Sequence, residues 1–249
     1  MTTELKISPK TEIFYLSEDD EPLAESPEHL LAIVNTFTVL TQYLAGQQAI
    51  IFSNQFLYYV EGLPSARVAP DIMVIFDVEP GIRSNYKIWE EKQVPKIIIE
   101  MTSQGNKDND YLIKKSLYEQ LGVEEYWLFD PRGEWVPEQL LGYRLQEEGF
   151  YRKIRGDRSE TLQLRLVPEG SLLSFYRLDN EAKLLIPDEL SQALQAETRA
   201  KQEAQRQVAL EQRRVEVAQQ QAENAEQRAL ELEAMLDRYR HQFGDLPSS

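Results

Sequence analysis

Apolar residues recur at helical spacing early in the chain and then form short strand-like runs. Ser26 followed by Pro27 is typical of a helix N-cap and a first helical position, and apolar residues continue at three- and four-residue intervals to Gly46. The short apolar runs that follow each predict a strand: residues 49–52, 56–60, 72–76 and 97–99.

A second helix and further strands are predicted in the middle of the chain. Residues 109–121 have a helical pattern, and Gly122 stands where a left-handed C-cap would end the helix. Residues 126–129 form a short apolar run. Two or three more strands, around residues 140–145, 150–154 and 162–166, suggest a meander. This order predicts an α/β domain with a mixed central sheet.

The pattern changes at Pro187, after which Ala, Gln, Glu, Arg and Leu dominate. Positions spaced alternately by four and three from Leu190 onward number sixteen, and thirteen of them are apolar. We call this set the heptad seam. It predicts a coiled-coil helix over residues 187–249, after a domain over residues 1–186. Because the seam is rich in Ala and contains three charged residues, we expect modest pairing, and a single solvated helix is the alternative: Glu197, Lys201 and Glu211.

Composition limits the chemistry that the chain can perform. No apolar run reaches the length of a membrane span, and the N-terminus lacks the pattern of a signal peptide. The absence of cysteine and the presence of only two histidines exclude disulfides, thiolate catalysis and zinc clusters of Cys or His. We therefore expect a cytoplasmic protein in which any metal has oxygen ligands, as Mg²⁺ and Mn²⁺ prefer.

The net charge of −15 is unusual for a nucleic-acid-binding protein, because phosphate backbones attract basic surfaces. From Asp188 onward there are 12 acidic and 8 basic residues, so the tail carries −4 and the preceding residues carry −11. Either the basic residues therefore cluster locally, or the substrate is not a long duplex. One group has this character, although an exposed hairpin explains it equally well: Arg152, Lys153, Arg155 and Arg158.

Two carboxylates adjoin strands that should be buried. Asp71 opens the run at residues 72–76, and Glu100 ends the run at residues 97–99. A carboxylate on a buried strand is costly unless it is paired or binds a cation. Two such groups on neighbouring strands can hold one Mg²⁺ ion and leave positions for water and phosphate. For Asp71, a turn cap or an ion pair with Arg67 is the alternative.

The helix predicted after Glu100 supplies a cation. Asp110, Lys114 and Tyr118 recur every four residues and so share one face, which can overhang the carboxylates. A lysine there can orient or help deprotonate an attacking water, or neutralise charge in the transition state. A solvated lysine is the alternative. We expect Tyr118 to pack in the core, and His29 to be a surface or capping residue.

Together these motifs resemble a known family. Asp71 after a proline, Glu100 after an apolar strand, and Asp-x3-Lys-x3-Tyr leading into residues 122–127 are similar to the Uma-two family of restriction-endonuclease-like proteins. That family is abundant in cyanobacteria, was long known as a domain of unknown function, and belongs to the PD-(D/E)XK nuclease superfamily. The resemblance covers about residues 10–180.

The resemblance implies a restriction-endonuclease-like fold and Mg²⁺-dependent (or Mn²⁺-dependent) hydrolysis of DNA. Asp71 and Glu100 would hold the metal, with the backbone carbonyl of Met101 as a third ligand. The superfamily pattern has a lysine two residues after the glutamate, where this chain has Thr102. In this branch Lys114 on the following helix matches the motif.

Two further residues are accessory candidates, and the heptad seam suggests an assembly. Glu28 and Asp110 are accessory candidates at the metal, although Asp110 is also typical of a first-turn residue that interacts with the helix dipole. A homodimer formed through the C-terminal helix would bring two active sites to one DNA duplex. The alternatives are a non-catalytic, nuclease-derived scaffold that recruits partners through its coiled coil, and a nuclease for RNA or single strands. Four residues are candidates for DNA contact: Lys107, Lys115, Lys153 and Arg155.

Overall fold

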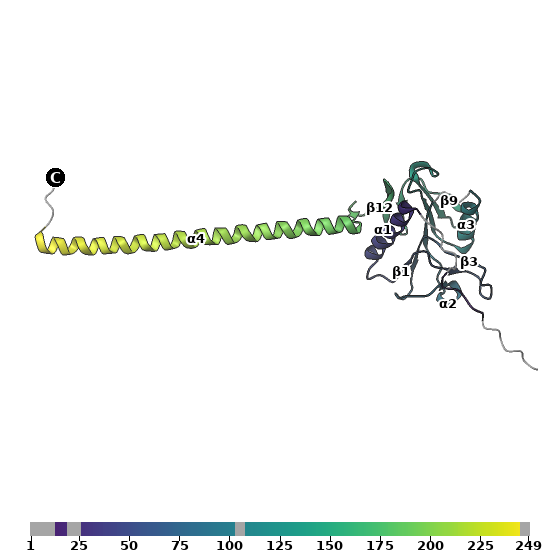
Figure 1. Ribbon diagram of the computed structural model, residues 1–249, viewed down its shortest axis with the longest axis horizontal. Coiled ribbons are helices and arrows are strands. Elements are labelled where there is room, and N and C mark those ends of the chain that lie inside the picture. The colour runs from purple at the N-terminus through teal and green to yellow at the C-terminus, as the bar shows by residue number, and fades with distance from the viewer. Residues whose placement is uncertain (1–12, 19–25, 103–107, 245–249) are drawn as a thin grey trace, which may run out of the picture. The chain divides into compact units, whose positions relative to one another are not determined.

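The structure is a computed structural model that describes residues 13–18, 26–102 and 108–244. The chain divides into two compact units, Met1–Asp188 and Glu189–Ser249. The first unit is a mixed α/β domain, and the second consists mainly of one helix (Figure 1).

A six-stranded mixed sheet forms the centre of the first unit. Neighbouring strands are antiparallel except for the third and fourth, which are parallel because α3 (Asp108–Leu121) connects them and returns the chain to the same end. The central strands are buried on both faces, which explains their continuous apolar runs. The strand order is β1 (Ala49–Phe52), β4 (Ile72–Phe76), β6 (Ile97–Met101), β7 (Glu125–Phe129), β8 (Leu140–Leu145) and β9 (Tyr151–Lys153).

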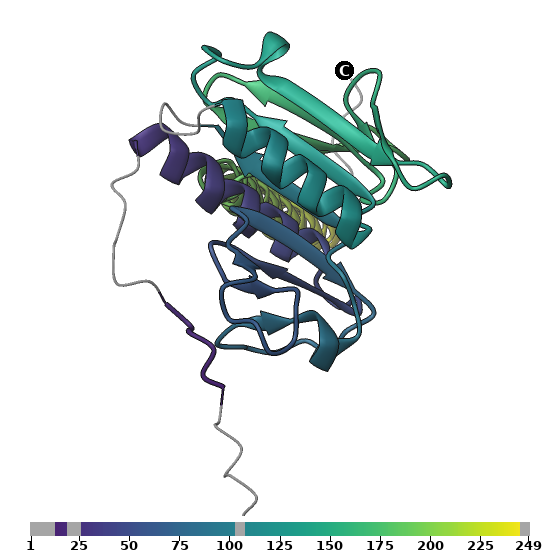
Figure 2. The same ribbon diagram turned by 90° about the vertical axis from the view of Figure 1, so that its right-hand side faces the viewer.

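One helix and one small sheet cover each face of the central sheet. On one face lie α1 (Pro27–Tyr43) and the sheet of β10 (Arg158–Ser159), β11 (Leu164–Glu169), β12 (Leu172–Arg177) and β13 (Lys183–Leu184). On the other lie α3 and the sheet of β3 (Arg67–Val68), β2 (Leu57–Tyr58) and β5 (Tyr86–Lys87). The remaining short helices are α2 (Ile88–Glu91) and η1 (Pro137–Gln139). In Figures 1 and 2, β1 and its neighbours (blue) lie below the later strands (teal to green).

Local sequence signals account for the ends of both core helices. The Ser26 hydroxyl accepts a hydrogen bond from the backbone N–H of His29 at 3.3 Å, with Pro27 at the first helical position. Gly122 follows α3 with a φ of +84°, a left-handed conformation that glycine adopts without strain. The predicted mixed α/β fold with flanking helices is confirmed.

The predicted meander is in fact divided between two sheets. The strands expected around residues 140–145 and 150–154 are β8 and β9 of the central sheet, whereas the strand expected at 162–166 is β11 of the four-stranded sheet. The strand expected at 56–60 is only the two-residue β2. Such two-residue strands form through pairing with distant segments, so a sequence period does not reveal them.

The second unit is dominated by α4 (Pro187–Phe243), a continuous helix of 57 residues. At 1.5 Å per residue it is about 85 Å long. Apolar residues of the heptad seam are exposed along it, as Leu194, Val208 and Leu232 show. The long helix is confirmed, and its pairing stays a prediction. Among the described residues, none of the helices has the length and apolar character needed to span a membrane.

Candidate active site

Asp71 and Glu100 face each other across two neighbouring strands. β4 and β6 pair with Ile72 opposite Ile99, so continuing this register by one residue brings Asp71 opposite Glu100. Directly opposed residues of an antiparallel pair point to the same face of a sheet. The backbone N–H of Met101 donates a hydrogen bond to Asp71 Oδ2 at 2.6 Å, which fixes this carboxylate against the end of β6. The structure thus brings the two predicted carboxylates together.

α3 brings two further groups to Glu100. Lys114 Nζ donates to Glu100 Oε2 at 3.1 Å, and the Tyr118 hydroxyl donates to Glu100 Oε1 at 2.6 Å. The two donors are one helical turn apart, as their spacing predicted. Glu100 and Tyr118 are buried, whereas the Lys114 side chain keeps 21% of its surface exposed. Lys114 therefore contacts the buried carboxylate of Glu100 while part of its own side chain is exposed to solvent.

The electrostatics of this site favour a bound cation. Burial and then repulsion from Asp71 raise the pKa of Glu100 to about 7, although Lys114 and the Tyr118 hydroxyl act in the opposite direction. Two buried carboxylates beside one ammonium group are a donor set that suits a hard divalent cation. Among the described residues no group of three or more Asp, Glu, His or Cys side chains could hold a metal. Within the described part of the chain, further ligands would therefore be backbone, water or substrate oxygens.

His29 belongs to the surroundings of this site, which the sequence did not reveal. Its side chain is buried, and Nε2 lies 3.7 Å from Asp71 Oδ1. The prediction of a surface residue is therefore wrong, although the His29 backbone N–H does take part in the Ser26 cap. The helix that follows the cap directs His29 toward the start of β4, a contact between segments far apart in the sequence.

Of the remaining metal-site candidates, Glu28 and Met101 lie within the described residues. Glu28 forms an ion pair with Arg132, with 3.2 Å between Oε2 and Nη2, and its side chain is 42% exposed. The structure therefore does not bring Glu28 together with the two carboxylates. Met101 is the last residue of β6 and is fully buried. Lys107 and the side chain of Asp110 lie outside the described residues.

The described candidates for DNA contact lie on α3 and at β9. The ammonium group of Lys115 lies 4.7 Å from the centre of the Tyr143 ring. Lys153 is the last residue of β9, and Arg155 follows it; both are exposed. These residues are therefore on the same domain as the carboxylates, at the far edge of the central sheet.

Comparison with known proteins assigns the chain to a family. A family model described as Uma2, "Putative restriction endonuclease", matches residues 15–175, a range that includes Asp71, Glu100 and Lys114. No curated protein matches the chain in sequence. Among solved structures the chain is similar to "a putative nuclease belonging to DUF820 from Anabaena variabilis ATCC 29413", with 20% identity and a TM-score of 0.42 over 60% of this chain and 75% of that chain. The chain belongs to the Uma2 family of putative restriction endonucleases.

Proposed function

We propose that the protein is a metal-dependent endonuclease that hydrolyses DNA phosphodiester bonds. The observation that carries this proposal is the pair of buried carboxylates, Asp71 and Glu100, with Lys114 beside one of them. Family membership supports a nuclease. The carboxylate pair supports dependence on Mg²⁺ or Mn²⁺, because its negative charge exceeds what one lysine offsets and because these ions prefer oxygen ligands.

The proposed role of each residue follows from its contacts. Asp71 and Glu100 are both fixed by hydrogen bonds, from Met101 N–H and from Tyr118 and Lys114 respectively, so the ligand set is preorganised. A metal bound there would polarise the phosphate and favour ionisation of a water molecule. The backbone carbonyl of Met101 is the proposed third protein ligand. Lys114, which reaches solvent, would orient the attacking water and stabilise the negative charge that develops on the phosphate.

The test is cleavage of plasmid and oligonucleotide DNA with Mg²⁺ or Mn²⁺. We expect nicking or linearisation by the wild type, and a loss of about 100-fold or more in Asp71→Ala and Glu100→Ala. Glu147→Ala, which removes an exposed carboxylate from the β8–β9 turn, is the matched control and should retain activity. Cleavage retained by Asp71→Ala would contradict the site assignment. A folded wild type that cleaves neither DNA nor RNA would favour the non-catalytic scaffold.

We also propose that α4 pairs with α4 of a second copy. The exposed apolar heptad seam needs a partner to be removed from water, and a second copy supplies an identical seam. In a parallel, in-register pair, Arg228 of one copy would lie beside Glu233 of the other at the positions that flank the seam. This charge complementarity favours the parallel orientation, which would put two nuclease units at the same end of the coil.

A further inference from the structure

Four exposed cationic residues are concentrated between the start of β9 and the start of β10. Together with Arg144 they line an open groove of about 300 Å³, in which Glu160 is the acidic lining residue. In the part of the chain that the structure describes, none of the four forms an ion pair with a carboxylate. We call these residues the basic cluster: Arg152, Lys153, Arg155 and Arg158.

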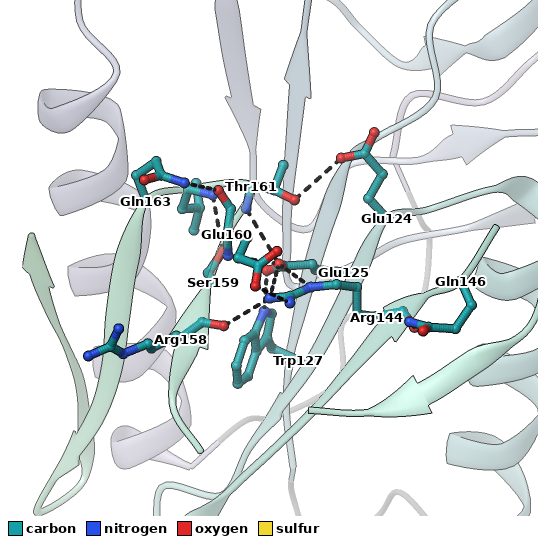
Figure 3. Close-up of polar contacts among 11 residues, drawn as sticks. Glu124, Glu125, Trp127, Arg144, Gln146, Arg158, Ser159, Glu160, Thr161 and Gln163 are labelled. Carbon is teal, nitrogen blue, oxygen red and sulfur yellow. Dashed lines mark hydrogen bonds and ion pairs between the residues drawn. The ribbon is translucent and has the colours of Figure 1, made fainter. Parts of the chain in front are cut away.

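Arg144 differs from the basic cluster because carboxylates neutralise its charge. Its Nη2 lies 2.9 Å from Oε1 of the fully buried Glu125, and its Nη1 lies 2.7 Å from Oε1 of Glu160. Arg144 Nη2 also donates to the carbonyl oxygen of Arg158 at 3.1 Å. Figure 3 shows that the Arg158 guanidinium points away from these carboxylates, so only its backbone joins the network. These contacts of Arg144 thus fix the positions of Glu160 and of the Arg158 backbone at the groove.

The positive charge of the basic cluster lacks internal compensation. Arg152 lies directly opposite Arg144 in the β8–β9 pair, and the two carboxylates beside Arg144 are already paired with Arg144. On a chain whose net charge is −15, such a cluster stands out from its surroundings. Four charges spread from β9 through the following loop to the start of β10 match a row of phosphates better than a single small anion.

The basic cluster lies at the free edge of the sheet that carries the carboxylates. β9 is three strands away from β6 in the same sheet, which corresponds to about 14 Å. Lys153 is in one cross-strand row with Tyr143, Tyr126 and Ile98, so its side chain points to the same face as Ile98 and Glu100. Arg152, which pairs with Arg144, points to the opposite face, so the two cations lie on either side of the free edge of the sheet at β9. This lateral distance equals about four base-pair steps of B-DNA.

We propose that the basic cluster binds the phosphate backbone of the nucleic acid outside the cleavage site. The identity of the polyanion rests on the proposed nuclease function. The basic cluster supplies sequence-independent affinity for a substrate that passes the sheet edge, three strands from the strand that carries Glu100. An acidic protein can in this way bind a polyanion through one local surface.

The test is the affinity of the full chain for a short fluorescent DNA duplex, measured by anisotropy in EDTA over a range of NaCl concentrations. Each lost phosphate contact should reduce the slope of log K against log salt by about 0.9, so Arg152→Gln/Arg155→Gln should bind about tenfold more weakly, or worse, at low salt. The control Lys92→Gln/Arg199→Gln removes the same charge from exposed residues outside the groove and should bind like the wild type. Single-stranded DNA and RNA arms identify the preferred backbone.

The outcomes separate the groove from the nuclease. Equal affinity and salt slope in the groove variant and the control would overturn the proposal, and so would a wild type that binds none of the three nucleic acids. A wild type that binds through the groove but never cleaves would count against the nuclease alone. If the wild type cleaves DNA and Arg152→Gln/Arg155→Gln binds DNA with wild-type affinity, the proposed role of the basic cluster would be wrong and the proposed nuclease function would stand.

Discussion

Two tyrosines provide a matched test of how Glu100 is held. Tyr118 and Tyr126 are both buried, with ring centres 5.3 Å apart. The Tyr118 hydroxyl donates to Glu100, whereas that of Tyr126 has no hydrogen-bond partner among the described residues. Tyr118→Phe removes a donor that orients a proposed metal ligand, so Mg²⁺ affinity should fall about tenfold or more, while Tyr126→Phe should leave it unchanged. Calorimetric titration with Mg²⁺ measures both.

Tyr118→Phe should also change the pH dependence of metal binding. The Tyr118 hydrogen bond lowers the pKa of Glu100, so its loss should move the rise in Mg²⁺ affinity to higher pH. Raising the Mg²⁺ concentration should restore cleavage, because the variant keeps both carboxylates and Lys114. Equal metal affinities and equal pH profiles for the two phenylalanine variants would show that the hydroxyl has no positioning role.

Glu100 should make the stability of the metal-free protein depend on pH. Because its pKa is raised from 4.5 to about 7 in the folded state, its contribution to stability is complete below the unfolded pKa and is lost as pH rises through about 7. Glu100→Gln stays uncharged at every pH. Its melting temperature relative to the wild type should therefore increase between about pH 5 and about pH 8, on the order of 5 °C. Thermal melts in EDTA measure this, and a constant difference would contradict it.

The sequence revealed the residues of the site that obey local spacing. Glu100 follows three isoleucines, and the four-residue spacing puts Lys114 and Tyr118 on one face of α3. The sequence predicts only core packing for Tyr118, so its hydrogen bond to Glu100 is a finding of the structure. The approach of His29 to Asp71 depends instead on how α1 packs over the sheet. The choice of Arg132 as the partner of Glu28 likewise depends on tertiary packing, which no spacing rule contains.

At the scale of secondary-structure elements, the pairing of β7 with β8 depends on a missing side chain. Gly142 lies opposite Trp127, and a Cβ added there would lie 2.5 Å from Trp127 Cζ3. Because Trp127 is fully buried, Gly142→Ala must displace it and should lower the free energy of unfolding by about 1–3 kcal/mol. In Gly81→Ala the nearest atom, Arg83 Nη1, is 3.6 Å away, so little change is expected. Equal urea midpoints for Gly142→Ala and the wild type would mean that Trp127 moves without a loss of stability.

The elements also show which parts of a fold a single sequence can predict. The buried strands β4 and β6 are continuous apolar runs, and α1 and α3 carry their own start or stop signals, so all four were predicted. β12 was missed, because its buried Leu173, Ser174 and Phe175 match neither a strict alternation nor a continuous apolar run. Its assignment to a second sheet depends on its pairing with β11.

At the scale of the whole molecule, leucines that differ only in their face of α4 can test the dimer. Leu232 and Leu236 are on the heptad seam, whereas Leu210 and Leu230 are off it, and all four are exposed. Leu232→Asp/Leu236→Asp would bury charges in the proposed interface, so sedimentation should show a monomer, while Leu210→Asp/Leu230→Asp should stay dimeric. A wild-type protein that sediments as a monomer would contradict the pairing.

The same variants test whether pairing of α4 affects the product of cleavage. Because the proposed catalytic residues all lie in the first unit, the Leu232→Asp/Leu236→Asp monomer should still nick plasmid DNA at a rate per site close to that of the wild type. Linearisation needs two cuts in opposite strands near one another, so at low protein concentration its ratio to nicking should fall in the monomer and not in the off-seam control. If the monomer gives the same ratio of linearised to nicked plasmid as the wild type, double-strand cleavage does not depend on the dimer, and α4 has another role.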